Sequence, residues 1–292
     1  DYLAHGPFTS EADMRPWLES VAAAKDAVYV GYRDNASGRL GGMGSFKRGL
    51  SLQALAPRIE RAFKIKHLAA VALAVNSPGG SPVQSALIAK RIRDLAAEHE
   101  IPVHAFIEDV GASGGYWLAC AADRIHAQSS SIVGSIGVVS GGFGFTEMIA
   151  KLGIDRRLHT SGDKKAMLDP FGPEKAADVK HLKALQAEIH DDFKDMVRER
   201  RGTKLQSDEK TLFSGAFWTG RAALELGLID GLGDLRSVMR DIHGEDVRFR
   251  MLDERRPWWR KRFGMDADLG SEFSSGLIAS IEERMAWNRF GL

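Results

Sequence analysis

The chain alternates between continuous apolar runs and segments whose apolar residues recur at helical spacing. The run LAAVALAV at 68–75 ends in the turn residues NSPGG, a pattern typical of a strand buried on both faces of a parallel sheet. The run at 103–107 follows Pro102 and predicts a second buried strand, and shorter runs at 27–32 and 125–127 predict two more. Residues 52–63 and 85–97 have the helical period. The alternation of strands and helices predicts an α/β fold.

The second half of the chain is expected to be more helical. Its glycine-rich part at 131–144 is followed by a predicted strand at 155–160 and a charged helix at 174–200. Within that helix Val179, Leu182, Leu185, Ile189 and Phe193 share one face, which we expect to face the core. A further helix is predicted at 220–226 and a turn-rich stretch at 230–234.

Composition and charge exclude several classes of protein. With 44% hydrophobic and 27% charged residues over 292 positions, the chain is globular. A net charge of +1 excludes a globally basic nucleic-acid binder, and the single Cys120 excludes an intrachain disulfide framework. No run approaches the ~18 apolar residues of a membrane-spanning helix, and the first residues lack the pattern of a leader. We therefore expect a chain without a transmembrane segment.

Two glycine-rich turns each follow a predicted buried strand, NSPGGS at 76–81 and GASGGYW at 111–117. Ligands of open α/β sheets bind beyond the carboxyl ends of the strands, so both turns are candidate sites. Ser113 would begin a helix in the apolar segment 116–122, where unpaired N–H groups and the helix dipole favour a developing oxyanion. The alternative is a simple N-cap, which spacing alone favours, because GASGG is not the G-x-S-x-G elbow.

A serine nucleophile needs a base, and lysine is a better candidate than histidine in this chain. The nine histidines are scattered, and none adjoins a glycine-rich turn in the sequence. Lys164 and Lys165 lie in SGDKKAMLDPFG at 161–172, just before an apolar Ala-Met-Leu. A lysine desolvated among apolar groups loses its proton readily and can act as a general base. A solvated loop lysine remains the simpler interpretation of either residue.

Other motifs exclude cofactors or point to a surface. No Cys/His cluster has zinc-ligand spacing, and the glycine turns match neither the dinucleotide nor the P-loop pattern, so we expect no metal and no cofactor. RRPWWRKRFG at 255–264 interleaves cations with aromatic rings. This stretch suits an anionic membrane surface or nucleic acid, and a subunit interface or a cationic surface stretch equally well.

Taken together, five strings identify a family resemblance. NSPGGSPVQS, GASGGYWLACAAD, GSIGVV at 134–139, SGDKK…PFG and LFSGAFWTGRAALELGLIDGLGD at 212–234 occur in the order and spacing of the signal peptide peptidase A (SppA) family of serine peptidases. The resemblance covers roughly residues 48–242 and is to single-repeat, SohB-like members. It implies a ClpP/crotonase-like fold of repeated ββα units in a peptidase domain at 46–245. An N-terminal segment at 1–45, which the resemblance does not support, and a C-terminal basic and aromatic helical extension at 246–292 flank that domain.

The resemblance also implies roles for individual residues. Ser113 would be the nucleophile, and the register of the S-G-x-x-K string selects Lys165 as the general base. Gly80 and Gly114 would supply the oxyanion-hole N–H groups, and Ser135 would hydrogen-bond the base. Family members form homo-oligomeric rings, in which serine and lysine can come from neighbouring protomers.

The implied function is a serine endopeptidase that degrades cleaved signal peptides or other small apolar peptides through an acyl-enzyme. The implied location is bacterial, at the inner membrane or in the cytoplasm, with possible membrane contact through Arg255, Trp258, Trp259 and Arg260 and with no nucleic-acid partner. Two alternatives stay open. One is a crotonase-like acyl-CoA enzyme that uses the same turns without the dyad, and the other is a non-catalytic ring-forming scaffold for peptides or membranes.

Overall fold

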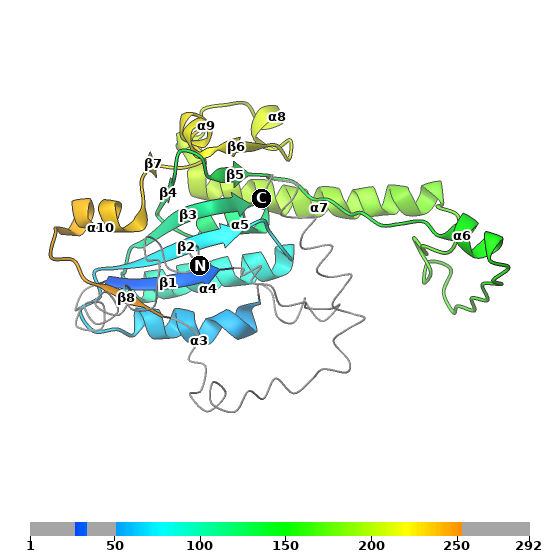
Figure 1. Ribbon diagram of the computed structural model, residues 1–292, viewed down its shortest axis with the longest axis horizontal. Helices are drawn as coiled ribbons and strands as arrows, with labels where there is room; N and C mark the ends of the chain where they lie inside the picture. Colours follow the sequence, from blue (N-terminus) through cyan, green and yellow to red (C-terminus); the bar gives the residue numbers. More distant parts are fainter. Residues whose placement is uncertain (1–26, 34–50, 253–292) are drawn as a thin grey trace.

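A single curled sheet organises the part of the chain that the computed structural model describes, residues 27–33 and 51–252 (Figure 1). Its strands are β1 (Ala27–Arg33), β2 (Ala70–Ser77), β3 (Val103–Ala112), β4 (Arg124–Ala127), β5 (Ile132–Gly134), β6 (Phe217–Thr219), β7 (Gly231–Leu232) and β8 (Phe249–Met251). The helices are α3 (Leu52–Phe63), α4 (Pro82–His99), α5 (Gly114–Ala119), α6 (Thr146–Lys151), α7 (Ala176–Arg201), α8 (Glu209–Leu212), α9 (Gly220–Glu225) and α10 (Leu235–His243), with a 3₁₀ turn at Gly202–Lys204. The expected α/β class is confirmed.

Strand β3 is where the sheet divides. The main order is β6-β5-β3-β2-β1-β8, and all its pairs are parallel except β5 with β6. The first part of β3, 104–107, pairs with β4, whereas 110–112 pairs with β5. A strand that changes partner along its length turns the sheet out of a plane. The sequence predicted a glycine-rich turn at 111–117, but β3 continues through Gly111 and Ala112 because β5 pairs with them.

Both faces of β2 are buried, as the continuous apolar run predicted. Val71 and Leu73 point into the large core under α3, α4 and α5. Ala70 and Ala72 point to the other face, where Met239 of α10 packs against them. The small alanine side chains on this face let α10 approach the sheet. On the opposite face the larger Val and Leu side chains supply most of the apolar burial, about 1.5–3 kcal/mol for each.

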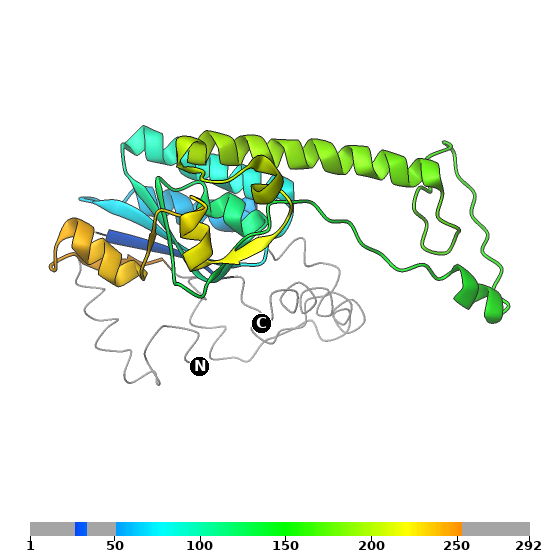
Figure 2. The ribbon, with the colours of Figure 1, turned by 90° about the horizontal axis from the view of Figure 1, so that it is seen from above.

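Helix α7 is buried only in its C-terminal half, so the expectation that the whole apolar face of 174–200 meets the core was wrong. Phe193, Val197 and Arg201 are buried, but Leu185 is 42% exposed. A helix of 26 residues is about 39 Å long, and its N-terminal half extends beyond the sheet together with α6 (Figure 2). The buried half is fixed by Arg201, which forms an ion pair with Asp230 at 2.7 Å.

The segment from Val139 to Lys175, which we call the arm, includes α6 and reaches away from the sheet (Figures 1 and 2). The strand predicted at 155–160 does not form, and none of the described strands pairs with these residues. Among the described helices, none has both the length and the apolar composition required to cross a bilayer.

Three histidines gather on the α10 face of the sheet. The rings of His104 and His126 stack with centroids 6.4 Å apart, and His243 meets His104 edge-on at 6.3 Å. His104 is 5% exposed, and its Nδ1 has no hydrogen-bond partner. Burial, followed by the proximity of His126, lowers the pKa of His104 to about 4, and burial also lowers the pKa of His126.

This cluster predicts acid sensitivity. Between pH 6.5 and 4, His104 is protonated in the unfolded chain but remains neutral in the folded protein. Protonation therefore favours the unfolded chain, and the free energy of unfolding should fall by about 1–3 kcal/mol as the pH drops through this window. Urea unfolding measured from pH 8 to 4.5 checks this. Asp230 contributes little above about pH 5. Burial raises its pKa, but hydrogen bonds from Arg201 and Lys204 outweigh burial and lower the pKa to about 2, so its stabilising contribution is lost mainly below the unfolded pKa of about 3.8.

The matched variants are His104→Gln, which should flatten the pH dependence, and His181→Gln on the exposed side of α7, which should leave it unchanged. An equal pH slope in both variants would contradict the assignment to His104.

Candidate active site

The two glycine-rich turns meet at the ends of adjacent strands. In the register of β2 with β3, Ser77 lies opposite Gly111, so the chain leaves both strands at the same edge of the sheet. After β2 it turns through Gly79 and Gly80 into α4, and after β3 it turns at Ser113 into α5. The site expected from the sequence is therefore formed by two turns in contact.

Glycine is required where these turns touch. A Cβ on Gly79 would lie 2.9 Å from the Cβ of Ser113, and Gly79 also has a φ of +130°. A Cβ on Gly114 would lie 2.5 Å from Ser85 Oγ and 3.1 Å from the Gly80 nitrogen. These distances leave no room for a side chain and bring the Gly80 and Gly114 backbones together beside Ser113.

Ser113 has a backbone conformation that L-residues rarely adopt, with φ 51° and ψ −122°. Its N–H donates to the Gly134 carbonyl at 2.8 Å, and its own carbonyl accepts from the Trp117 N–H at 3.0 Å. The side chain makes no capping hydrogen bond, although Ser113 occupies the N-cap position of α5. Ser113 therefore has the N-cap position that the alternative expected, but its side chain does not cap the helix. Strain of this kind, about 1–3 kcal/mol, persists where the surroundings enforce it and is concentrated at functional sites.

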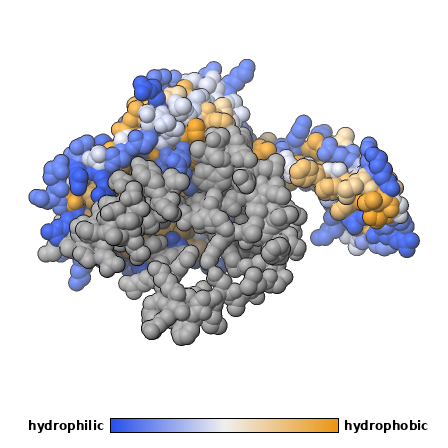
Figure 3. All heavy atoms as spheres, in the orientation of Figure 1, coloured by the Kyte–Doolittle hydropathy of each residue, from blue (hydrophilic) through white to orange (hydrophobic). Residues whose placement is uncertain are grey.

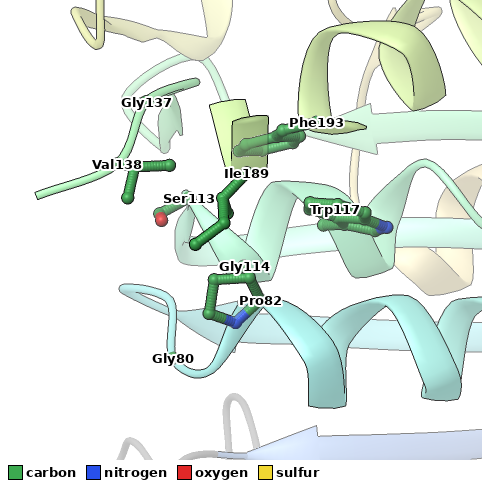
Figure 4. A pocket seen from close by; sticks show the side chains of 9 residues that line it. All are labelled: Gly80, Pro82, Ser113, Gly114, Trp117, Gly137, Val138, Ile189 and Phe193. Carbon is green, nitrogen blue, oxygen red and sulfur yellow. The ribbon is translucent and has the colours of Figure 1, made fainter. Parts of the chain in front are cut away.

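An apolar pocket lies in front of Ser113. Besides Gly80, Ser113 and Gly114, it is lined by Pro82, Trp117, Gly137, Val138, Ile189 and Phe193. Figure 4 shows the Ser113 hydroxyl pointing toward Val138 across the mouth of this pocket. Trp117 and Phe193 stack with ring centroids 4.7 Å apart, which joins α5 to α7. The pocket thus places a mainly apolar lining next to the Ser113 hydroxyl.

Ser135 lies in the segment that is hydrogen-bonded to the nucleophile candidate. It is 3% exposed, has a φ of 51°, and its N–H donates to the Ala216 carbonyl at 2.7 Å. Its neighbour Gly134 accepts the Ser113 N–H, so Ser135 and Ser113 are held by one short segment. The structure brings together Ser113, Gly80, Gly114 and Ser135 as the sequence predicted, and their roles stay predictions.

Lys165 is not among the residues that meet at this site. It is exposed, it does not line the pocket in front of Ser113, and it belongs to the arm, which reaches away from the sheet (Figures 1 and 2). Lys164 is exposed as well. Among the described residues, one chain therefore supplies the serine, the two glycine N–H groups and the apolar pocket, but no lysine lines that pocket.

Two polar side chains near the site were missed by sequence reasoning. Ser85 of α4 is fully buried without a hydrogen-bond partner, and its Oγ faces Gly114. His190 of α7 contacts the Ile136 carbonyl through Nε2 at 3.1 Å and so fixes the segment that follows Ser135. His190 adjoins Ile189 and lies three residues before Phe193, so the helical period could have placed it near the pocket.

Other candidate chemistry finds no support among the described residues. They contain no group of three His, Cys, Asp or Glu side chains able to hold a metal ion. Burial raises the pKa of the Cys120 thiol to about 12, which leaves it unreactive. Arg255, Trp258, Trp259 and Arg260 lie outside the described residues, and their membrane contact stays a prediction.

Comparisons with known proteins agree on a family. Residues 96–246 match the family model of Peptidase family S49. A protein of Synechocystis sp. named as a protease is 30% identical over 78% of this chain and 82% of its own. A protein of Enterococcus faecium named as signal peptide peptidase SppA is 32% identical over 58% of this chain and 48% of its own.

A longer relative carries a different name. A Brucella abortus protein named Na(+)/H(+) antiporter NhaA is 51% identical over 257 residues, which is 85% of this chain. The chain spans only 35% of the length of that relative.

The packing of the two turns gives a direct test. A Cβ on Gly115 would overlap the Ser77 carbonyl oxygen, so Gly115→Ala should lower the free energy of unfolding by about 1–3 kcal/mol. Gly141→Ala is the matched control, because a Cβ there meets nothing within 4 Å, and its effect should stay within about 0.5 kcal/mol. Equal denaturation midpoints for the two variants would show that the turns are not in contact.

Proposed function

The chain belongs to peptidase family S49, and on this premise we propose that it is a serine endopeptidase whose nucleophile is Ser113 and whose general base is the Lys165 of a neighbouring copy. The observation that carries the proposal is the strained Ser113 held between two glycine backbones at the mouth of an apolar pocket. The expected ClpP/crotonase-like fold is part of this proposal, and the curled, mostly parallel sheet supports it.

The reaction begins with a proton transfer. Neutral Lys165 takes the hydroxyl proton of Ser113 as Oγ attacks the substrate carbonyl, with Ser135 hydrogen-bonded to the lysine. The N–H groups of Gly80 and Gly114 hold the resulting oxyanion, which is worth about 3–4 kcal/mol for each donor. The lysine returns its proton to the leaving amine, and water then hydrolyses the acyl-enzyme.

A lysine serves as a base only when it leaves water, and Lys165 is exposed in the single chain. The arm that carries it also exposes apolar side chains, among them Phe143 at 70% and Leu152 at 65%. Figure 3 shows apolar residues gathered on the arm. Burying these residues against a second copy would desolvate the lysine and cover the apolar surface in one step, which supports a homo-oligomeric ring.

The apolar pocket supports small or apolar side chains next to the cleaved bond, as in cleaved signal peptides. Contact of the 255–264 stretch with a membrane surface would bring the enzyme to such substrates.

Single substitutions test the dyad. Ser113→Ala and Lys165→Ala should each abolish cleavage of an apolar peptide while assembly persists, whereas Lys164→Ala should be much milder. Steady-state cleavage assays and size-exclusion chromatography measure both properties. Retained cleavage by Ser113→Ala would rule out Ser113 as the nucleophile and with it the peptidase mechanism as proposed.

Mixing tests whether the dyad is shared. Ser113→Ala and Lys165→Ala chains, each inactive alone, should recover about one quarter of the wild-type activity when co-assembled at equal amounts, because only a site with both intact residues works. If both residues came from the same chain, the mixture would stay inactive.

Assembly through the arm is tested by Leu152→Glu. This substitution should yield a smaller species in light scattering and lose cleavage activity, because it places a charge in an apolar interface. Leu224→Glu changes a 37% exposed leucine on α9 and serves as the control that should keep both properties. Full-size, active Leu152→Glu would argue against the arm as the contact.

A further inference from the structure

The part of the arm that carries Lys165 is a loop whose two ends are fastened to each other. Arg156 donates through Nη2 to both carboxylate oxygens of Asp169, at 3.3 Å each, and Lys165 lies between these two residues in the sequence. The Arg156 guanidinium also lies over the Phe171 ring, 5.3 Å from its centroid. The ion pair and the cation–π contact hold the same arginine from two sides.

A second set of contacts fastens this closure to the start of α6. The rings of Phe145 and Phe171 lie with centroids 5.5 Å apart, and the Phe145 N–H donates to the Pro170 carbonyl at 2.6 Å. Asp169 Oδ1 accepts from the Phe171 N–H at 3.2 Å. We call Phe145, Arg156, Asp169 and Phe171 the arm clasp.

Inside the closed loop the backbone forms hydrogen-bonded turns rather than an extended segment. The Lys165 N–H donates to the Gly162 carbonyl at 3.1 Å, and the Met167 N–H donates to the Lys164 carbonyl at 3.3 Å. Leu168 has a φ of 55°, which a leucine adopts only where its surroundings enforce it. Leu168 directly precedes Asp169, so the clasp holds the strained end of the loop.

The clasp has little to do with the stability of the sheet. Its residues belong to the arm, outside both hydrophobic clusters of the core, and the Arg156 side chain is 43% exposed. Exposed ion pairs contribute little to the free energy of unfolding. What the contacts fix is the geometry of the loop that carries the lysine.

We propose that the arm clasp is a positioning device, centred on Arg156, that presents Lys165 to the Ser113 of the neighbouring copy. This inference rests on the proposed shared dyad. It requires the clasp only in the chain that donates the lysine. A chain that donates only the serine has no use for its own clasp.

Co-assembly separates these two chains. In the mixture of Ser113→Ala with Lys165→Ala, the Ser113→Ala chain donates the lysine. Adding Arg156→Gln to that chain should lower kcat by about 10- to 100-fold with little change in KM, because a misplaced base slows the chemical step. Adding Arg156→Gln to the Lys165→Ala chain should leave the activity within about twofold.

Two matched variants complete the design. Asp169→Asn removes the ion pair without changing shape and should reproduce the asymmetry of Arg156→Gln. Arg157→Gln removes the neighbouring exposed ion pair with Asp155, outside the clasp, and should be silent in either chain. Light scattering verifies that each mixture assembles.

The results distinguish the shared dyad from the positioning role of the arm clasp. Equal losses in both chains would make the clasp a general structural element and overturn the inference, as would no loss in either chain. An inactive parental mixture would instead overturn the shared dyad, and the inference with it. Activity that falls only when the lysine-donating chain carries the substitution supports the clasp as a positioning device.

Discussion

The contact between two backbones at the edge of the sheet is the constraint on which the site depends. Strands β2 and β3 are neighbours, so the turns that follow them meet, and the space between them accepts no side chain at Gly79 or Gly115. This crowding, together with the hydrogen bond from its N–H to Gly134, holds Ser113 in a strained conformation with its side chain released from capping. The burial of apolar side chains on both faces of β2 provides the free energy that maintains this strain.

The N-terminal half of α7 and the arm extend beyond the sheet and do not pack against its described strands. Helix α7 packs through Phe193 and Val197 at its C-terminal end and then runs on beyond the sheet. The arm continues from the pocket wall at Val138 and returns to the start of this helix, and several of its apolar residues, such as Phe143 and Leu152, are exposed. In the described part of the chain, the sheet and its turns thus hold Ser113, whereas Lys165, our proposed base, lies in the arm and does not line the pocket. A second copy joins the two in our proposal.

Local patterns in the sequence predicted much of this architecture. The helix at 52–63 has the predicted bounds, and the run at 68–75 marked the buried strand β2. Periodicity identifies an apolar face but not what covers it, which is why 174–200 was placed wholly against the core. The prediction of a strand at 155–160 was wrong, because strand formation depends on a pairing partner that lies elsewhere in the sequence. The contact of His190 with Ile136 joins residues 54 apart in the sequence, which no local pattern reveals.

A dyad divided between chains, as we propose, would change what the surface contacts must accomplish. A lysine at the end of a long arm has many positions available, and only a few bring its amine to a hydroxyl on another chain. Reaction rate depends on that fraction far more steeply than folding stability does. Weak exposed contacts such as Arg156 with Asp169 can therefore matter greatly for chemistry while contributing little to unfolding. The strain at Ser113 and the closure around Lys165 address the same problem, which is to fix each reacting atom before the two chains meet.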